Sequence, residues 1–108
     1  MIPLTWTDVG DGYGFWRASA SVASGATSDY IRVNYNNSKT TVAVYPSNRA
    51  RAQYTIDSPE EIVAATAVWI DWPLGNITSA RTDTLLGVVT GIRLVSVSGT
   101  ASMEVLSI

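Results

Sequence analysis

The sequence predicts an all-β fold, an antiparallel β-sandwich or jelly-roll-like barrel of about eight strands with little or no helix. Apolar and polar residues alternate with period two, short turns of Gly, Ser and Asn separate these runs, and β-branched and aromatic residues fill them. A chain of 108 residues is long enough for one modest core, so we expect a single domain over residues 1–108.

Four runs in the first half of the chain predict half-buried strands: FWRASASV (residues 15–22), DYIRVNY (29–35), TTVAVY (40–45) and RAQYTI (51–56). Residues two apart share a face of a strand, so each run has one apolar face directed at the core. These faces comprise Trp16, Ala18, Ala20 and Val22; Ile31, Val33 and Tyr35; Val42 and Val44; and Ala52, Tyr54 and Ile56.

Small-residue turns separate the strands. NNSK (residues 36–39) predicts a hairpin loop, and ASGATS (23–28) and SGT (98–100) predict tight turns. Gly25 and Gly99 are the residues in these turns that tolerate a positive φ angle.

The segment SPEEIVAATAVW (residues 58–69) carries conflicting signals. Ser58 followed by Glu61 has the spacing of a helix capping box, with a proline at the first helical position. The apolar run after it is short and rich in β-branched residues. We therefore expect a turn and then a strand over residues 62–71, with a single helical turn at 59–62 as the alternative.

The C-terminal third is the most apolar part of the chain. LLGVVTGIRLVSV (residues 85–97) predicts one long central strand, and ASMEVLSI (101–108) predicts its hairpin partner. Gly91 marks a bulge or a close approach of the backbone.

The stretch WIDWPLG (residues 69–75) allows two interpretations. Its aromatic rings and acid suggest a shelf for a sugar. In a regular strand, however, Trp69 and Asp71 share one face while Ile70 and Trp72 share the other, so the two rings cannot form one flat surface. We favour a buried strand that ends at the following proline, with an interface role as a third option.

No catalytic or metal-binding arrangement is apparent. Cysteine and histidine are absent, which removes thiol nucleophiles, imidazole bases and the usual zinc ligands. Glu60 and Glu61 are adjacent and fit a helix start or turn, and the loop DVGDGYG, with Asp8 and Asp11, does not match calcium-loop spacing. We therefore expect no enzyme, no cofactor and no metal.

An enzyme is the least favoured class. It would need opposed carboxylates across a cleft, such as Asp71 facing Asp83 or Glu104. The two classes ahead of it are a structural subunit of an assembly and a binding module.

Charge and hydropathy also narrow the functions that the sequence allows. The chain is 46% hydrophobic and only 15% charged, with a net charge of −2, and its densest basic spot is the pair Arg49 and Arg51. We expect no binding to nucleic acid, which needs a basic patch, and no membrane span. The N-terminus lacks the charged and apolar regions of a signal peptide, so we expect none.

Three segments resemble small structural proteins of tailed-bacteriophage virions. They are GVVTGIRLVSVSGTASMEVLSI (residues 87–108), WIDWPLGNITS (69–79) and LTWTDVGDG (4–12). The resemblance implies a non-enzymatic capsid decoration (cement) protein, made in the host cytoplasm, located in the virion, and bound as a homo-oligomer, preferably a trimer, to the major capsid protein or other virion proteins. The alternatives are a tail, neck or fibre component, or a carbohydrate-binding module that recognises a host glycan.

Such a protein binds through buried area and aromatic anchors. The candidate interface residues are Tyr13, Phe15 and Trp16, which flank a glycine-rich loop, together with Trp72. The competing interpretation places Trp16 in the core and lets Tyr13 pack within the loop.

Overall fold

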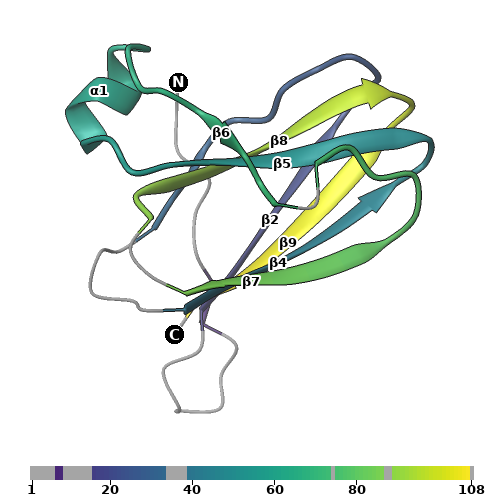
Figure 1. Ribbon diagram of the computed structural model, residues 1–108, viewed down its shortest axis with the longest axis horizontal. Coiled ribbons are helices and arrows are strands. Elements are labelled where there is room, and N and C mark those ends of the chain that lie inside the picture. Colours follow the sequence, from purple (N-terminus) through teal and green to yellow (C-terminus); the bar gives the residue numbers. More distant parts are fainter. Residues whose placement is uncertain (1–6, 9–15, 34–38, 74, 87–88, 108) are drawn as a thin grey trace.

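Strands dominate the part of the chain that the computed structural model describes, which comprises residues 7–8, 16–33, 39–73, 75–86 and 89–107 (Figure 1). The elements are β1 (Thr7–Asp8), β2 (Trp16–Val22), β3 (Ile31–Arg32), β4 (Lys39–Pro46), β5 (Arg49–Thr55), α1 (Pro59–Val63), β6 (Ile70–Asp71), β7 (Arg81–Leu86), β8 (Gly91–Ser98) and β9 (Ala101–Ser107). The predicted all-β class is confirmed.

These strands form two antiparallel sheets. The five-stranded sheet has the order β1-β2-β9-β4-β7, and the four-stranded sheet has the order β3-β8-β5-β6. Strands β2, β4, β7 and β9 lie in the five-stranded sheet, and β3, β5 and β8 lie in the four-stranded sheet. Consecutive strands from β2 to β5, and again from β7 to β9, therefore alternate between the two sheets. The chain therefore winds between the two layers, as in a jelly roll (Figure 1).

Two predicted hairpins are wrong. Residues 36–39 lead from β3 to β4, and residues 98–100 lead from β8 to β9, and in both cases the two strands lie in different sheets. The single strand expected over residues 85–97 is likewise two strands, β7 and β8, again in different sheets. Alternation identifies the buried face of a strand, but it does not say whether the next strand pairs beside it or crosses to the facing sheet.

The core lies between the inner faces of the two sheets, and it follows the predicted period-two pattern for β2, β4 and most of β5. Val42, Leu94, Met103 and Val105 are at most 1% exposed. The buried cluster comprises Ala18, Ala20, Ile31, Val33, Val42, Val44, Ala50, Ala52, Trp72, Ile77, Val89, Ile92, Leu94, Ala101, Met103 and Val105.

The pattern fails at two strand ends. Ile56 was expected in the core, but β5 ends at Thr55 and Ile56 is 62% exposed. In the predicted strand over residues 29–35, the observed strand is β3 (Ile31–Arg32), the Val33 N–H also donates to the Thr90 carbonyl, and residues 34–35 lie outside the described part.

The predicted strand over residues 62–71 is wrong for most of its length, and the helical alternative is right. Ser58 caps α1: its Oγ accepts a hydrogen bond from the Glu61 N–H at 3.3 Å and lies 3.3 Å from Glu61 Oε1. Only Ile70–Asp71, which form β6, are strand. The capping interactions outweighed the β-propensity of a short segment that has no neighbouring strand to pair with.

Gly91 explains how α1 packs on the sheet. A Cβ atom at Gly91 would lie 3.1 Å from Ile62 Cδ1, 3.3 Å from Trp69 Cη2 and 3.4 Å from Thr55 Cγ2. Ile62, the buried residue of α1, therefore packs directly on the outer face of the four-stranded sheet. The expected close approach at Gly91 is confirmed, as are the turns at Gly25 and Gly99, both with φ of 73°.

Candidate functional site

The stretch 69–75 forms the end of an edge strand, with Trp72 in the core. Trp72 is 2% exposed and packs edge-to-face on Tyr54, with ring centres 5.6 Å apart. Its Nε1–H donates to Asp83 Oδ2 at 3.1 Å, which links the β6 edge of one sheet to the β7 edge of the other. The Trp72 side chain is therefore part of the sandwich and does not offer a surface to a partner.

The other residues of this stretch lie as the period-two pattern predicts. Gln53 pairs with Asp71, and Tyr54 pairs with Ile70. Asp71 therefore faces outward beside Gln53, while Ile70 faces the same side as Tyr54. The two tryptophans do not share a surface, which excludes the flat sugar shelf.

Five side chains on the outer face of the four-stranded sheet form what we call the Arg–Trp network: Arg51, Gln53, Trp69, Asp71 and Arg93. The Arg93 guanidinium lies 4.3 Å from the centre of the Trp69 ring, and its Nε donates to Gln53 Oε1 at 2.8 Å. Gln53 Nε2 and Arg51 Nε both donate to Asp71 Oδ1, at 2.9 and 3.0 Å. The network fixes two arginines and a tryptophan, residue types that are enriched in interface hot spots.

This network holds more positive than negative charge. Burial lowers the pKa of Arg93 below its ordinary value, and the nearby positive charge of Arg51 lowers it further. Asp71 is the carboxylate that pairs with Arg51, at 3.0 Å. A further carboxylate beside Arg93 would therefore interact favourably with this face.

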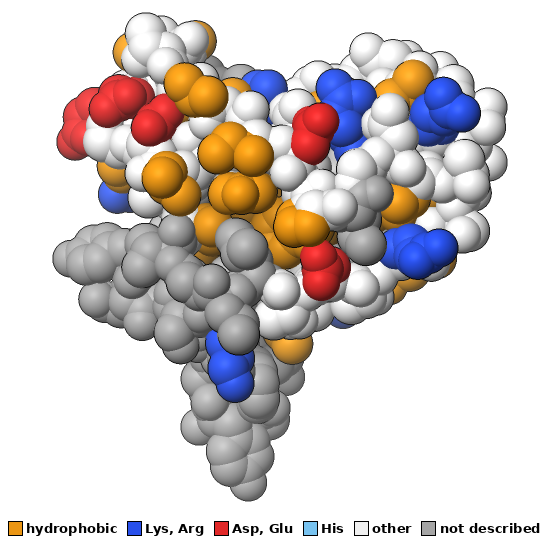
Figure 2. Space-filling view, viewed as in Figure 1, with side chains coloured by type: hydrophobic (Ala, Val, Ile, Leu, Met, Phe, Trp, Pro, Cys, Tyr) orange, Lys and Arg blue, Asp and Glu red, His pale blue; other side chains and the backbone are white. Residues whose placement is uncertain are grey.

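A second surface, which we call the open-edge patch, consists of exposed apolar side chains around α1 and β6: Ile56, Val63, Val68 and Ile70. They are 62%, 62%, 67% and 41% exposed. Ile70 pairs with Tyr54 at the edge of the four-stranded sheet. Figure 2 shows hydrophobic side chains gathered near the centre of this view of the molecule, beside β6. Exposed apolar side chains that gather on one surface are typical of protein-binding sites.

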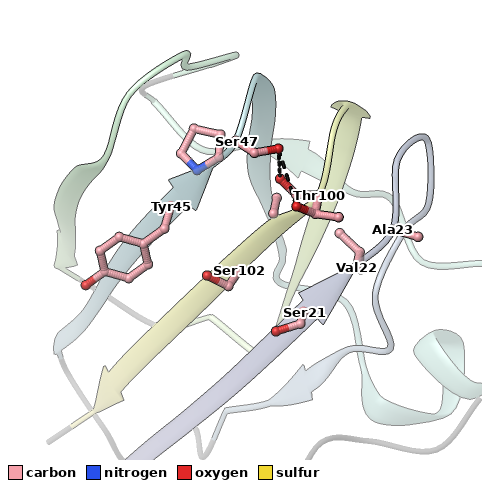
Figure 3. A pocket seen from close by; sticks show the side chains of 9 residues that line it. Ser21, Val22, Ala23, Tyr45, Ser47, Thr100 and Ser102 are labelled. Carbon is pink, nitrogen blue, oxygen red and sulfur yellow. Dashed lines mark hydrogen bonds between the residues drawn. The ribbon is translucent and has the colours of Figure 1, made fainter.

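A third surface is a shallow hollow of about 670 Å³ over the ends of β2, β4 and β9, which we call the Tyr45 hollow (Figure 3). Tyr45 pairs with Ser102, and Ser102 pairs with Ser21, so three hydroxyl-bearing side chains form a row across three strands. The Tyr45 side chain is 44% exposed. The lining residues carry no charge: Ser21, Val22, Ala23, Tyr45, Pro46, Ser47, Thr100, Ala101 and Ser102.

The remaining candidate anchors are only partly described. Tyr13 and Phe15 lie outside the described residues. The backbone of Trp16 begins β2 and pairs with Ser107 and Asp8, but its side chain also lies outside the description. Their interface role stays a prediction.

The carboxylates considered for catalysis point in different directions. Asp71 faces outward from the four-stranded sheet, whereas Glu104 is exposed between the buried Met103 and Val105 on the opposite sheet. Asp83 receives the hydrogen bond of the buried Trp72. Neither Asp83 nor Glu104 therefore faces Asp71 across a cleft.

Glu60 and Glu61 lie in the first turn of α1, where their charge favours the helix N-terminus. The described residues contain no group of three or more His, Cys, Asp or Glu side chains placed to hold a metal ion. Among them, no helix is long and apolar enough to cross a membrane.

Sequence reasoning missed the Arg–Trp network and the Tyr45 hollow. Alternation already placed Arg51 with Gln53 on one face, and Trp69 with Asp71 on one face. The missing information was that β5 pairs with both β6 and β8, which brings Arg93 between Gln53 and Trp69. The hollow likewise depends on β9 lying between β2 and β4.

Comparison with known proteins supports the fold alone. No protein-family model and no curated protein matches the chain. Among solved structures, a recombinant oxalate oxidase in complex with glycolate is 13% identical with a TM-score of 0.58, over 96% of this chain and 49% of that one. A Cupin 2 conserved barrel domain protein from Salinispora arenicola is 12% identical with a TM-score of 0.51, over 94% of this chain and 68% of the other.

The fold is thus that of cupin-like jelly rolls. The chain spans about half or less of the length of several of these neighbours, such as an oxalate oxidase of which it covers 41%. Oxalate oxidase is an enzyme, but structural similarity at such low sequence identity is no evidence of an activity in this chain.

Proposed function

We propose that this chain is a non-enzymatic structural protein of a bacteriophage virion that decorates the outer surface of the capsid. The resemblance of residues 4–12, 69–79 and 87–108 to small virion proteins suggests the class. The open-edge patch is the observation that carries the proposal, because a protein that acts by attachment needs exposed apolar area for a partner. The partner in this proposal is the major capsid protein.

The patch has the properties that attachment requires. Val63 and Val68 are each more than 60% exposed, so burying them against a partner removes apolar surface from water at about 25 cal/mol per Å². Both are held by ordered local structure: Val63 ends α1, and the Val68 N–H donates to Asp57 Oδ2 at 2.6 Å. A preformed surface of this kind loses little entropy on binding.

Binding to capsids tests the proposal. Purified protein is incubated with expanded capsids of the phage that encodes it, and the particles are sedimented and their bound copies counted. We expect saturable binding with a fixed number of copies per capsid. The Val68→Lys variant should bind at least about tenfold more weakly, because a charge would be buried in the contact.

The control is Leu106→Lys, which introduces the same charge on the outer face of the five-stranded sheet, where Leu106 is 37% exposed. It should bind like the unaltered protein. Absence of binding, or equal binding by the Val68 variant, would count against the proposal. Binding to tails alone would favour a tail, neck or fibre component instead.

The Tyr45 hollow favours a second candidate, a module that binds a neutral host glycan. An uncharged, hydroxyl-rich surface beside an exposed ring suits sugar hydroxyls and sugar faces. It ranks second because the hollow offers only one bare aromatic ring. Titration of labelled protein with neutral oligosaccharides tests it: chemical shifts should move at Tyr45 and Ser102, and Tyr45→Ala should abolish the change. No shift at millimolar sugar would reject this candidate.

A further inference from the structure

The outer face of the four-stranded sheet has charges of opposite sign at its two ends. The end beside α1, which we call the acidic end, carries Asp57, Glu60 and Glu61, with Arg32 of β3 paired nearby to Gly91. The opposite end, which we call the arginine end, carries Arg49 and Arg51 at the start of β5, whereas Arg93 and Asp71 both pair with Gln53 near the middle of the face. The acidic end therefore has three negative charges and one positive charge, and the arginine end has two positive charges.

Both ends also expose an apolar side chain. Val63 is 62% exposed at the acidic end, and Val97 is 42% exposed near the end of β8 at the arginine end. Strand β5 runs from one end to the other, and its seven residues separate them by about 20 Å. The ends are thus far enough apart to make separate contacts while belonging to one surface.

The outer face also has a raised part, formed by α1, which we call the α1 step. Ile62 packs over Gly91, so α1 rises from the outer face at the acidic end alone among the described elements. Between the ends lie Gln53, Trp69, Asp71 and Arg93 of the Arg–Trp network, and Arg93 is held in place by its hydrogen bond to Gln53 and by the Trp69 ring. If a second copy is rotated by 180° and placed on this face, opposite charges therefore lie against each other, and the raised α1 of each copy lies beside the arginine end of the other.

We infer that two copies of this chain pair through the outer faces of their four-stranded sheets, antiparallel about a two-fold axis. In this arrangement the acidic end of each copy lies on the arginine end of the other, so both charge contacts form at once. The α1 step of each copy rests beside the arginine end of its partner, and the central residues Gln53, Trp69, Asp71 and Arg93 of the two copies lie between these contacts. The parallel arrangement would oppose like charges.

This pair shares Val63 with the open-edge patch but depends on the charges of the outer face, so the charge-reversal variants test it separately from capsid binding. It also differs from the trimer that the resemblance implies. A head-to-tail ring would use two separate surfaces on each subunit, whereas here both ends belong to one face, and a two-fold axis satisfies them together.

Light scattering and sedimentation over a concentration series at low salt test the inference. We expect the unaltered protein to approach twice the monomer mass as concentration rises. Arg49→Glu and Glu60→Arg each place like charges together at both contacts of the pair, so each should raise the dissociation constant at least about tenfold. Both residues are exposed, so neither substitution disturbs the core.

Mixing the two variants is the decisive step. In a mixed pair, Glu60 of one copy meets Arg49 of the other, and the introduced Arg meets the introduced Glu, so association should return to the unaltered level. The Glu104→Arg control, on the opposite sheet, should associate normally. A monomer at every concentration, unaltered association of the single variants, no recovery on mixing, or a stable mass above a dimer would each overturn the two-fold pair.

Discussion

At the scale of single residues, Thr40 and Thr55 form a natural pair for comparison. Both are 0% exposed. Thr40 Oγ1 has no hydrogen-bond partner among the described residues, whereas Thr55 Oγ1 accepts a bond from the Asp57 N–H at 3.2 Å. Burying a hydroxyl without a partner opposes folding, and burying a bonded one is close to neutral.

Replacement of each threonine by valine tests this difference. Thr40→Val should raise the free energy of unfolding by about 1 kcal/mol, because it removes an unsatisfied hydroxyl and keeps the shape. Thr55→Val should lower it by about 1 kcal/mol, because it leaves the Asp57 N–H without its acceptor. Urea denaturation measures both. Equal changes in the two variants would show that Thr40 does have a partner.

The burial of single residues could be predicted from the sequence at some positions and not at others. Alternation placed Val42 and Val44 in the core correctly, because both lie well inside a strand covered by the facing sheet. The same rule failed for Ile56, which follows the last residue of β5. Whether a residue at a strand end is covered depends on the length of the other sheet, which no local pattern records.

At the scale of elements, α1 shows two local signals in competition. The capping residues Ser58 and Glu61 and the β-branched residues after them predicted different structures, and the capping interaction prevailed. Packing then stabilised the result, since Ile62 is only 3% exposed. A five-residue helix is not stable alone in water, so this contact with the sheet is essential to it.

The substitution Gly91→Ala tests that contact. The added methyl group would lie 3.1 Å from Ile62 Cδ1, so α1 must shift or be strained. We expect the free energy of unfolding to fall by about 1–3 kcal/mol, measured by urea denaturation.

Ile62→Val provides the matched control, because it removes the methyl group that clashes. Alone it should lower the stability by about 1 kcal/mol. Combined with Gly91→Ala it should cost less than the sum of the two single changes. Additive losses would mean that α1 does not pack on Gly91 in solution.

At the scale of the whole molecule, the winding of the chain decides which strands are central. β9 lies between β2 and β4, and β8 lies between β3 and β5, whereas β6 is a two-residue edge strand and β7 is also an edge. Most stabilising contacts therefore converge on the last two strands of the chain. Local opening should begin at the edges and reach β8 and β9 last.

Hydrogen exchange measured by NMR tests this order. Backbone amides of Met103 and Val105 in β9 and of Leu94 in β8 should exchange about two orders of magnitude more slowly than the Trp72 amide, which follows β6 and donates to the Ala52 carbonyl of β5. The central residues are fully buried, and opening them requires both sheets to separate. Comparable rates at Trp72 and in β9 would contradict the strand order.

Local sequence patterns were enough to predict that the protein is built from strands, which face of β2, β4 and β5 is buried, and where Gly25 and Gly99 turn the chain. These are local properties, because side-chain alternation and positive φ angles depend only on adjacent residues. The tertiary structure alone decided which strands pair, that β8 and β9 lie in different sheets, and that Arg93, Gln53 and Trp69 meet on one face. A short glycine turn serves a hairpin and a crossing between sheets equally well, so the choice depends on the burial gained across the whole sandwich.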